Sequence, residues 1–351
     1  MPGTPRSFLV YISSFSEEDP GIQAARMDAQ TGRLELLRRT TDTTTPFFLA
    51  LSSCRRFLYA IDEYEQGGVA AFERVDDDGG LVRLNRQPAS DSACYLSVDV
   101  AGTMVFTATY AAGDIFGYPV RPDGSLGAAG VFVHHQGSSV TPERQAASHP
   151  HAIVPSPDNR HVYVVDLGMD VIHGYRFDAE RGALTQSEPP IVRTAPAAGP
   201  RHMEFHPSAP WVYVINEISD TITHYDYDSA SGALHERKTL STLPPGYDEV
   251  TDTADIKITP SGRFLYGTNR GHDSIAVFQI GDSGELALVD ITEGVGRGPQ
   301  HLAMSPDGSY LLCSNMPGDT IVVYRIDDET GRLSRVGDPI PMARPSCAVF
   351  V

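Results

Sequence analysis

The sequence has few of the features that mark nucleic-acid-binding or membrane proteins. Basic residues are scarce: 27 Lys and Arg stand against 45 Asp and Glu, and the net charge of −18 disfavours contact with phosphate backbones or anionic lipids. No apolar run approaches the ~20 residues that a membrane helix needs. We therefore expect neither a nucleic-acid partner nor a membrane partner.

Signals for export and for disulfide formation are also missing. The start, MPGTPRSFLVYISSFS, has one Arg and a short apolar run, FLVYI, which is too short for the hydrophobic region of a signal peptide. The cysteines lie far apart without a C-x-x-C pair, which favours reduced thiols in a core over disulfides or a zinc site. They are Cys54, Cys94, Cys313 and Cys347. These features predict a cytoplasmic protein.

Helical periodicity and cofactor motifs are absent as well. No segment repeats apolar residues every 3.6 positions over three turns, so helices are expected only as short insertions. The chain has no glycine-rich phosphate loop and no compact metal-ligand motif, and we expect activity to need neither a divalent metal nor an organic cofactor. In contrast, 32 Gly and 26 Pro are spread along the whole chain, which predicts many short elements joined by turns.

One phrase, an acidic residue followed by Gly and then Leu, recurs seven times. Its leucines, on average about 50 residues apart, are Leu34, Leu81, Leu126, Leu184, Leu234, Leu286 and Leu333. Three strand patterns precede each phrase, as in residues 200–228, and a fourth follows it. This order predicts an all-β fold, a seven-bladed β-propeller forming a single domain over residues 1–351. The alternative, a row of independent β-sandwiches, would need linkers that the repeat lacks.

The two ends of the repeat pattern complement each other. The first repeat begins at a second-strand pattern, FLVYIS, and residues 345–351 match an opening-strand pattern. We expect residues 345–351 to pair beside the strand around Phe8 to Ile12. This pairing would close the ring and remove two free strand edges, which are aggregation hazards.

Equivalent positions of the innermost strands should meet around a central channel. Two adjacent opening-strand positions hold Phe47, Cys94, His151, Arg201, Ala254, Gln300 and Ser346, then Phe48, Tyr95, Ala152, His202, Asp255, His301 and Cys347. The position after each second strand holds Phe15, Glu63, Tyr110, Leu167, Glu217, Arg270 and Met316. Ionisable residues gather in the middle repeats. A charged side chain facing a channel needs a partner or a ligand, so these residues are candidates for a functional site.

Other interpretations of these residues stay open. Arg201 and Glu217 could form a buried ion pair within one blade, and His202 or His301 could be a hydrogen-bonded core histidine. A metal site is a further interpretation, although no compact ligand spacing supports it. Its ligands would come from His149, His151, His202 and Asp255.

Three segments, residues 148–170, 199–217 and 254–278, resemble the seven-bladed propeller lactonases. This family includes bacterial 6-phosphogluconolactonases and the fungal carboxymuconate lactonising enzyme. The resemblance covers nearly the whole chain and implies an active site at the channel mouth. The catalytic residues that it implies are His151, Arg201, Glu217 and Arg270. As substrate-binding residues we assign Tyr95, His149, His202, Asp255, Gln300 and His301.

Two departures from the family pattern bear on the substrate. Gln300 stands where the family commonly has Arg, and Tyr95 stands where it commonly has His. The channel mouth has therefore lost positive charge that a phosphate dianion would use. We expect a carboxylated or neutral lactone to be turned over at least as well as 6-phosphogluconolactone.

The resemblance implies a lactone hydrolase of the 6-phosphogluconolactonase type, acting on a small polar or acidic sugar-like lactone. Glu217 or His151 would activate water, Arg201 or Arg270 would stabilise the oxyanion, and the other arginine would bind the substrate anion. A carboxymuconate-type cycloisomerase uses the same residue types and remains an alternative. A non-catalytic scaffold for a protein partner is the third. The sequence leaves the oligomeric state open.

Overall fold

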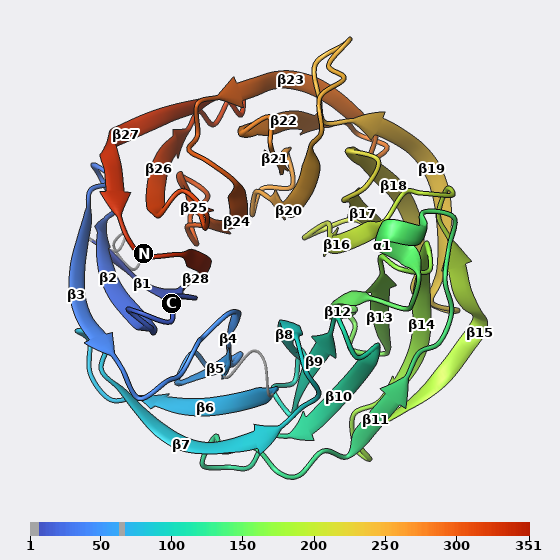
Figure 1. Ribbon diagram of the computed structural model, residues 1–351, viewed down its shortest axis with the longest axis horizontal. Coiled ribbons are helices and arrows are strands. Elements are labelled where there is room, and N and C mark those ends of the chain that lie inside the picture. The colour runs from blue at the N-terminus through green and yellow to red at the C-terminus, as the bar shows by residue number, and fades with distance from the viewer. Residues whose placement is uncertain (1–6, 63–66) are drawn as a thin grey trace.

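A computed structural model describes residues 7–62 and 67–351. These residues form seven four-stranded antiparallel sheets arranged around a centre (Figure 1). The predicted seven-bladed β-propeller is therefore confirmed. Glu63, which the repeat alignment places near the channel, lies outside the described residues.

The strands of each blade run from the innermost to the outermost. Blade one contains β28 (Pro345–Phe350), β1 (Ser7–Ser14), β2 (Gly21–Asp28) and β3 (Leu34–Thr40). Blade two contains β4 (Leu49–Leu51), β5 (Phe57–Ile61), β6 (Gly68–Arg74) and β7 (Leu81–Pro88). Blade three contains β8 (Ala93–Val98), β9 (Met104–Thr109), β10 (Asp114–Pro119) and β11 (Val131–His134).

The remaining four blades follow the same order. Blade four contains β12 (Pro150–Pro155), β13 (His161–Asp166), β14 (Val171–Asp178) and β15 (Ala183–Arg193). Blade five contains β16 (Pro200–Phe205), β17 (Trp211–Asn216), β18 (Thr221–Asp228) and β19 (Ala233–Ser241). Blade six contains β20 (Asp252–Ile258), β21 (Phe264–Arg270), β22 (Ser274–Ile280) and β23 (Leu286–Glu293). Blade seven contains β24 (Pro299–Met304), β25 (Tyr310–Asn315), β26 (Thr320–Ile326) and β27 (Leu333–Pro341).

The ring closes where the two ends of the repeat pattern meet. β28 pairs with β1 in antiparallel register, with Tyr11 opposite Val349 and Ile12 opposite Ala348. The Ser13 hydroxyl group donates a hydrogen bond to the Cys347 carbonyl group and shares another with the Ser346 hydroxyl group, and both add to the pairing. The closure expected from the sequence is confirmed.

Helix is confined to α1 (Pro142–Gln145) in the part of the chain that the structure describes, as the sequence predicts. This segment follows blade three and lies above the inner strands near β16 (Figure 1). Among the described residues, no helix has the length and apolar character needed to cross a membrane.

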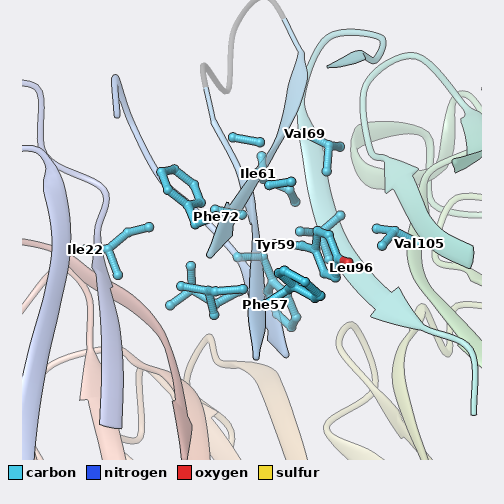
Figure 2. Packing of buried hydrophobic residues seen from close by; sticks show 14 of the residues in the cluster. Ile22, Phe57, Tyr59, Ile61, Val69, Phe72, Leu96 and Val105 are labelled. Carbon is cyan, nitrogen blue, oxygen red and sulfur yellow. The ribbon is translucent and has the colours of Figure 1, made fainter. Parts of the chain in front are cut away.

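The apolar core lies between neighbouring blades. One cluster joins Ile22 of β2 to Phe57 of β5 and Val105 of β9, so that it spans three blades (Figure 2). Similar clusters fill the other blade interfaces. Three of the four cysteines are buried as expected, but Cys54 is exposed because it lies in the turn between β4 and β5.

The recurring Gly-Leu phrase joins each blade to the one before it. In blade six, the Gly284 carbonyl oxygen accepts a 2.7 Å hydrogen bond from the Tyr213 hydroxyl group of blade five. The Tyr163–Gly232 and Tyr266–Gly331 pairs repeat this bond. Gly284 has a φ of +83°, and a Cβ atom there would lie 2.6 Å from a ring atom of His224. The glycine of the phrase is therefore required by backbone conformation and by close packing.

Candidate active site

A β-bulge in the opening strands of all blades except blade two explains why adjacent residues both reach the channel. The register of β12 against β13 shifts between Pro150 and Ala152, which leaves His151 unpaired. The register of β16 shifts in the same way around Arg201. Side chains normally alternate between the two faces of a strand, but a bulge redirects the extra residue. The bulged residues, His151 and Arg201 among them, therefore face the channel together with the residues that follow them in the strand.

Glu217 is the centre of the charged group at this mouth. It follows β17, is 4% exposed, and its Oε2 atom lies 2.7 Å from Arg201 Nε and 3.0 Å from Arg270 Nη2. The contact with Arg201 is an ion pair and not an aligned hydrogen bond, since neither atom meets hydrogen-bond geometry. A third arginine, Arg144, bonds to the Oε1 atom. The structure therefore brings together three of the four predicted catalytic residues and adds Arg144.

The three arginines determine the charge state of Glu217. Burial raises the pKa of this carboxyl group, but the positive charges of Arg270, Arg201 and Arg144 outweigh burial, and the net pKa lies below its usual value. Glu217 is therefore ionised at neutral pH. Both of its oxygen atoms already contact guanidinium groups, which makes it a weak proton acceptor.

Arg144 comes from an insertion outside the repeat. It lies in α1, and its Nη1 atom donates a 3.0 Å hydrogen bond to Asp252 Oδ1 in β20. Its side chain is 35% exposed, more than that of Arg270 at 25%. The sequence analysis missed Arg144 because it compared only equivalent repeat positions. The sequence did contain a signal for an insertion, because the spacing of 58 from Leu126 to Leu184 is the longest of the repeat.

His151 lies beside this charged group as a neutral imidazole. It is 8% exposed, and its Nδ1 atom has no hydrogen-bond partner within the described residues. Its ring makes edge contacts with the rings of Tyr110 and His202 at 5.5 and 5.3 Å. Burial, together with the nearby Arg201 and His202, holds the pKa of His151 well below its usual value. A neutral ring with an unpaired nitrogen can accept a proton.

Two of the predicted substrate-binding residues flank the mouth. His149 stacks on Tyr110 at 4.4 Å, and its Nδ1 atom lies 2.8 Å from the Tyr110 carbonyl oxygen. Gln300 lies beside Arg270, with 3.4 Å between Gln300 Oε1 and Arg270 Nη1. Both contacts fix the orientation of side chains at the edge of the site.

The other four predicted substrate-binding residues lie deeper, where side chains cross the channel. We call them, together with Phe48, the middle layer: Phe48, Tyr95, His202, Asp255 and His301. The Phe48 and Tyr95 rings are 4.5 Å apart, and the Tyr95 and His202 rings are 5.0 Å apart. Their role in substrate binding stays a prediction, since in the structure they contact one another.

Asp255 holds the middle layer together. Its Oδ1 atom accepts a 2.8 Å hydrogen bond from His202 Nδ1, and both of its oxygens bind Lys257 Nζ at 3.0 and 3.1 Å. Burial lowers the pKa of His202 to about 3 and that of His301 to about 4, so both rings are neutral at pH 7. The charge of Asp255 is therefore neutralised by Lys257.

A hollow lies on the other side of the middle layer, at the end where the opening strands finish. Its volume is about 480 Å³, and Glu204, Lys257 and Met304 contribute to its walls. Burial raises the pKa of Glu204 to about 7, although Lys257 opposes the shift. The sequence analysis did not single out Glu204.

The alternative metal site of the sequence analysis is not formed as a ligand cluster. Within the described ranges, a single group of ligand atoms has the spacing of a metal site, and it consists of His135, Asp166 and His173. None of the channel histidines His149, His151 and His202 belongs to it.

Comparisons with known proteins agree with this geometry. Residues 9–350 match the family described as "Lactonase, 7-bladed beta-propeller". A 6-phosphogluconolactonase of Bacillus subtilis is 32% identical over 348 residues, covering 98% of each chain. A putative 6-phosphogluconolactonase of Bacteroides fragilis superposes with a TM-score of 0.93 at 28% identity, covering 100% of both chains. A periplasmic gluconolactonase of Pseudomonas aeruginosa has a TM-score of 0.93 at 27% identity, covering 98% of this chain and 99% of that one.

These matches confirm the resemblance and, at the level of the family, the prediction of a lactonase-type enzyme. The family model covers nearly the whole length, and the strands that carry Glu217, Arg201 and Arg270 lie within the matched residues. The chain belongs to the seven-bladed β-propeller lactonase family.

Proposed function

We propose that the protein hydrolyses a small, polyhydroxylated lactone that carries an anionic group, with 6-phosphogluconolactone as the first candidate. The observation that carries this proposal is the buried Glu217 carboxylate with three arginines around it, next to a neutral His151. The B. subtilis relative is named a 6-phosphogluconolactonase, which supports the same substrate class.

We propose that His151 is the general base that takes a proton from the attacking water. Its Nδ1 atom is unpaired within the described residues, whereas both oxygens of Glu217 already contact arginines. Glu217 would then position the guanidinium groups. Because His151 Nδ1 is buried, the ring must turn toward the bound substrate before it can accept the proton from water.

The arginines divide between two tasks in this proposal. Arg201 is 2% exposed and lies closest to the interior, so we assign it to the oxyanion that forms when water attacks the carbonyl group. Arg270 and Arg144 have side chains 25% and 35% exposed, and we assign them to the anionic group of the substrate. Two guanidinium groups can hold a phosphate through several charge-assisted hydrogen bonds.

Arg144 alters the expectation about the substrate. The preference for a carboxylated or neutral lactone rested on positive charge that Gln300 and Tyr95 do not supply. Arg144 supplies a cation from outside the repeat, at 3.0 Å from Asp252 and bonded to Glu217. We therefore propose that phosphorylated lactones bind at least as well as carboxylated ones.

A substrate panel tests the function. Purified protein is assayed with 6-phosphogluconolactone, gluconolactone, carboxylated lactones and muconates, with products identified by mass. We expect hydrolysis of lactones in the wild type and its loss in Arg201→Ala, with activity retained in Arg181→Ala, whose arginine is 84% exposed on blade four. Cyclisation of a muconate without hydrolysis would favour the cycloisomerase instead. No turnover of any compound would favour the non-catalytic scaffold.

The cytoplasmic location stays a prediction from the sequence. The P. aeruginosa gluconolactonase with the same fold is named periplasmic, so the fold is found in proteins of that compartment too.

A further inference from the structure

A second cluster of ionisable side chains lies between blades three and four, outside the channel. It contains His135, which follows β11, Asp166, which ends β13, and His173 in β14. All three side chains are at least nine-tenths buried, with exposures of 7%, 0% and 7%. The proposed lactonase reaction uses none of them.

The ring nitrogens of this cluster are buried without partners. His135 Nδ1 and His173 Nε2 have no hydrogen-bond partner in the part of the chain that the structure describes. One ligand atom of each of the three residues lies within 4.8 Å of the other two, and His173 Nε2 is 3.6 Å from Asp166 Oδ2. Leaving a buried polar atom unpaired is costly, so two unpaired ring nitrogens in one cluster point to a missing partner.

Outer contacts already orient two of the three groups. His135 Nε2 lies 2.6 Å from the Tyr175 hydroxyl oxygen, which leaves Nδ1 as the nitrogen available for coordination. Asp166 Oδ1 accepts hydrogen bonds from the backbone N–H groups of His149, Gly168 and Met169, and Oδ2 accepts one of 2.6 Å from the Ser148 hydroxyl group and keeps a lone pair for a metal. Ligands in metal sites are characteristically fixed by such outer hydrogen bonds.

We propose that His135, Asp166 and His173 bind one divalent transition-metal ion, with Zn²⁺ as the test ion. Two imidazoles and a carboxylate form a donor set that suits zinc and its first-row neighbours, with water completing the coordination. Metal–ligand bonds of about 2.0–2.2 Å require the donor atoms to move closer by roughly 1 Å. The His135 and His173 rings, now stacked at 4.0 Å and 19°, must tilt apart as they do so.

The position of the cluster indicates a structural role for the ion. His135 begins the segment 135–149 that carries α1 and Arg144, and the N–H group of His149 at its other end binds Asp166. An ion held by His135 and Asp166 would thus tie both ends of this segment to blade four. It takes no part in a reaction step, and lactonase activity is not its test.

Zinc binding to the full chain is the direct experiment. Chelator-treated protein is titrated with Zn²⁺ by calorimetry, and bound metal is measured after dialysis. We expect one ion per chain, a higher Tm and slower hydrogen exchange in residues 136–148. Co²⁺ in place of Zn²⁺ should give the visible absorption of a cobalt site with nitrogen and oxygen ligands.

Three variants separate a metal site from a packed pair of rings. His173→Phe keeps a ring that can stack on His135 but removes the ligand nitrogen of residue 173. His135→Ala removes the ligand nitrogen of residue 135. Both variants should lose bound zinc and the increase in Tm. His161→Ala is the matched control, because His161 is buried and contacts the Tyr227 hydroxyl group at 3.1 Å but lies outside the cluster. Absence of stoichiometric zinc in the wild type, or equal zinc in wild type and His173→Phe, would overturn the proposal.

Discussion

At the scale of single residues, the two candidate bases differ in what surrounds them. Glu217 contacts three arginines, whereas His151 lies beside aromatic rings with an unpaired nitrogen. The sequence could not separate them, because both are ionisable residues expected at the channel mouth. Their environments distinguish them.

His151→Asn should therefore reduce kcat by about 10²- to 10⁴-fold, the usual contribution of a general base. KM and Tm should change little, since the Nδ1 atom of His151 makes no hydrogen bond in the described part of the chain. Steady-state kinetics with the substrate found in the panel, together with a melting curve, measures both. A wild-type kcat in His151→Asn would assign the base elsewhere, with Glu217→Gln as the next variant to compare.

Arg144→Gln should weaken binding of a phosphorylated lactone. Loss of one charge-assisted contact costs about 1.5–3 kcal/mol, so we expect KM to rise roughly ten- to a hundredfold, with a smaller rise for an uncharged lactone. Arg144→Lys keeps the charge and should recover part of the loss. If KM is the same in wild type and Arg144→Gln for both substrates, Arg144 does not contact the substrate anion.

Glu204 should make stability depend on pH. Burial raises its folded pKa from 4.5 to about 7, so the folded state favours the protonated carboxyl group. This contribution is complete below pH 4.5 and is lost as the pH rises through about 7, at a cost of roughly 3 kcal/mol. Relative to the wild type, Glu204→Gln should therefore gain stability between pH 5 and pH 8.

Urea denaturation of both proteins at a series of pH values measures that gain. Glu236→Gln on the exposed face of β19 is the control and should follow the wild type at every pH. A constant difference between Glu204→Gln and wild type over this pH range would show that Glu204 keeps an ordinary pKa.

At the scale of elements, the Gly-Leu turn is the unit that repeats, and its role is to contact the preceding blade. Gly284 and Gly246 have almost the same φ, +83° and +82°, but a Cβ atom at Gly246 would meet nothing within 4 Å. Substituting each by alanine therefore separates backbone strain from packing at the blade interface.

Gly246→Ala should lower stability by about 1 kcal/mol, because alanine disfavours positive φ. Gly284→Ala should cost roughly 1–3 kcal/mol more, since its Cβ atom would lie 2.6 Å from His224 and 2.7 Å from Trp211. Equilibrium denaturation of the two variants measures the difference. Equal losses would mean that the interface relaxes freely around the added methyl group.

The sequence predicted these turns and strands well, because each is determined by residues that lie close together in the sequence. An acidic residue, Gly and Leu at about 50-residue intervals define the turns, and alternation defines the strands. Arg144 was missed because it lies in an insertion that no other repeat contains. The grouping of His135, Asp166 and His173 was missed because two strands and the loop after β11, in two different blades, bring them together. Contacts between blades depend on how strands pack, which a single repeat does not encode.

At the scale of the whole molecule, the first blade is complete only when β28, from residues 345–350, pairs with β1. Removal of residues 345–351 would leave β1 and the neighbouring blades without their inner partner. We expect the truncated chain to lose its cooperative thermal transition as a whole, and a synthetic peptide of residues 345–351 to restore part of it. Calorimetry gives the result, and an unchanged transition in the truncated chain would argue that the blades are independent.

The middle layer also bears on the whole molecule, because its rings come from several blades and meet across the central channel. If the proposed hydrolysis takes place at His151, a lactone that enters at Arg144 meets Phe48, Tyr95 and His202 on the other side. The open-chain acid would then leave by the entrance, past the same arginines that attracted the substrate. Product would compete with incoming substrate for these cations, and the turnover rate would be limited by how quickly the acid departs.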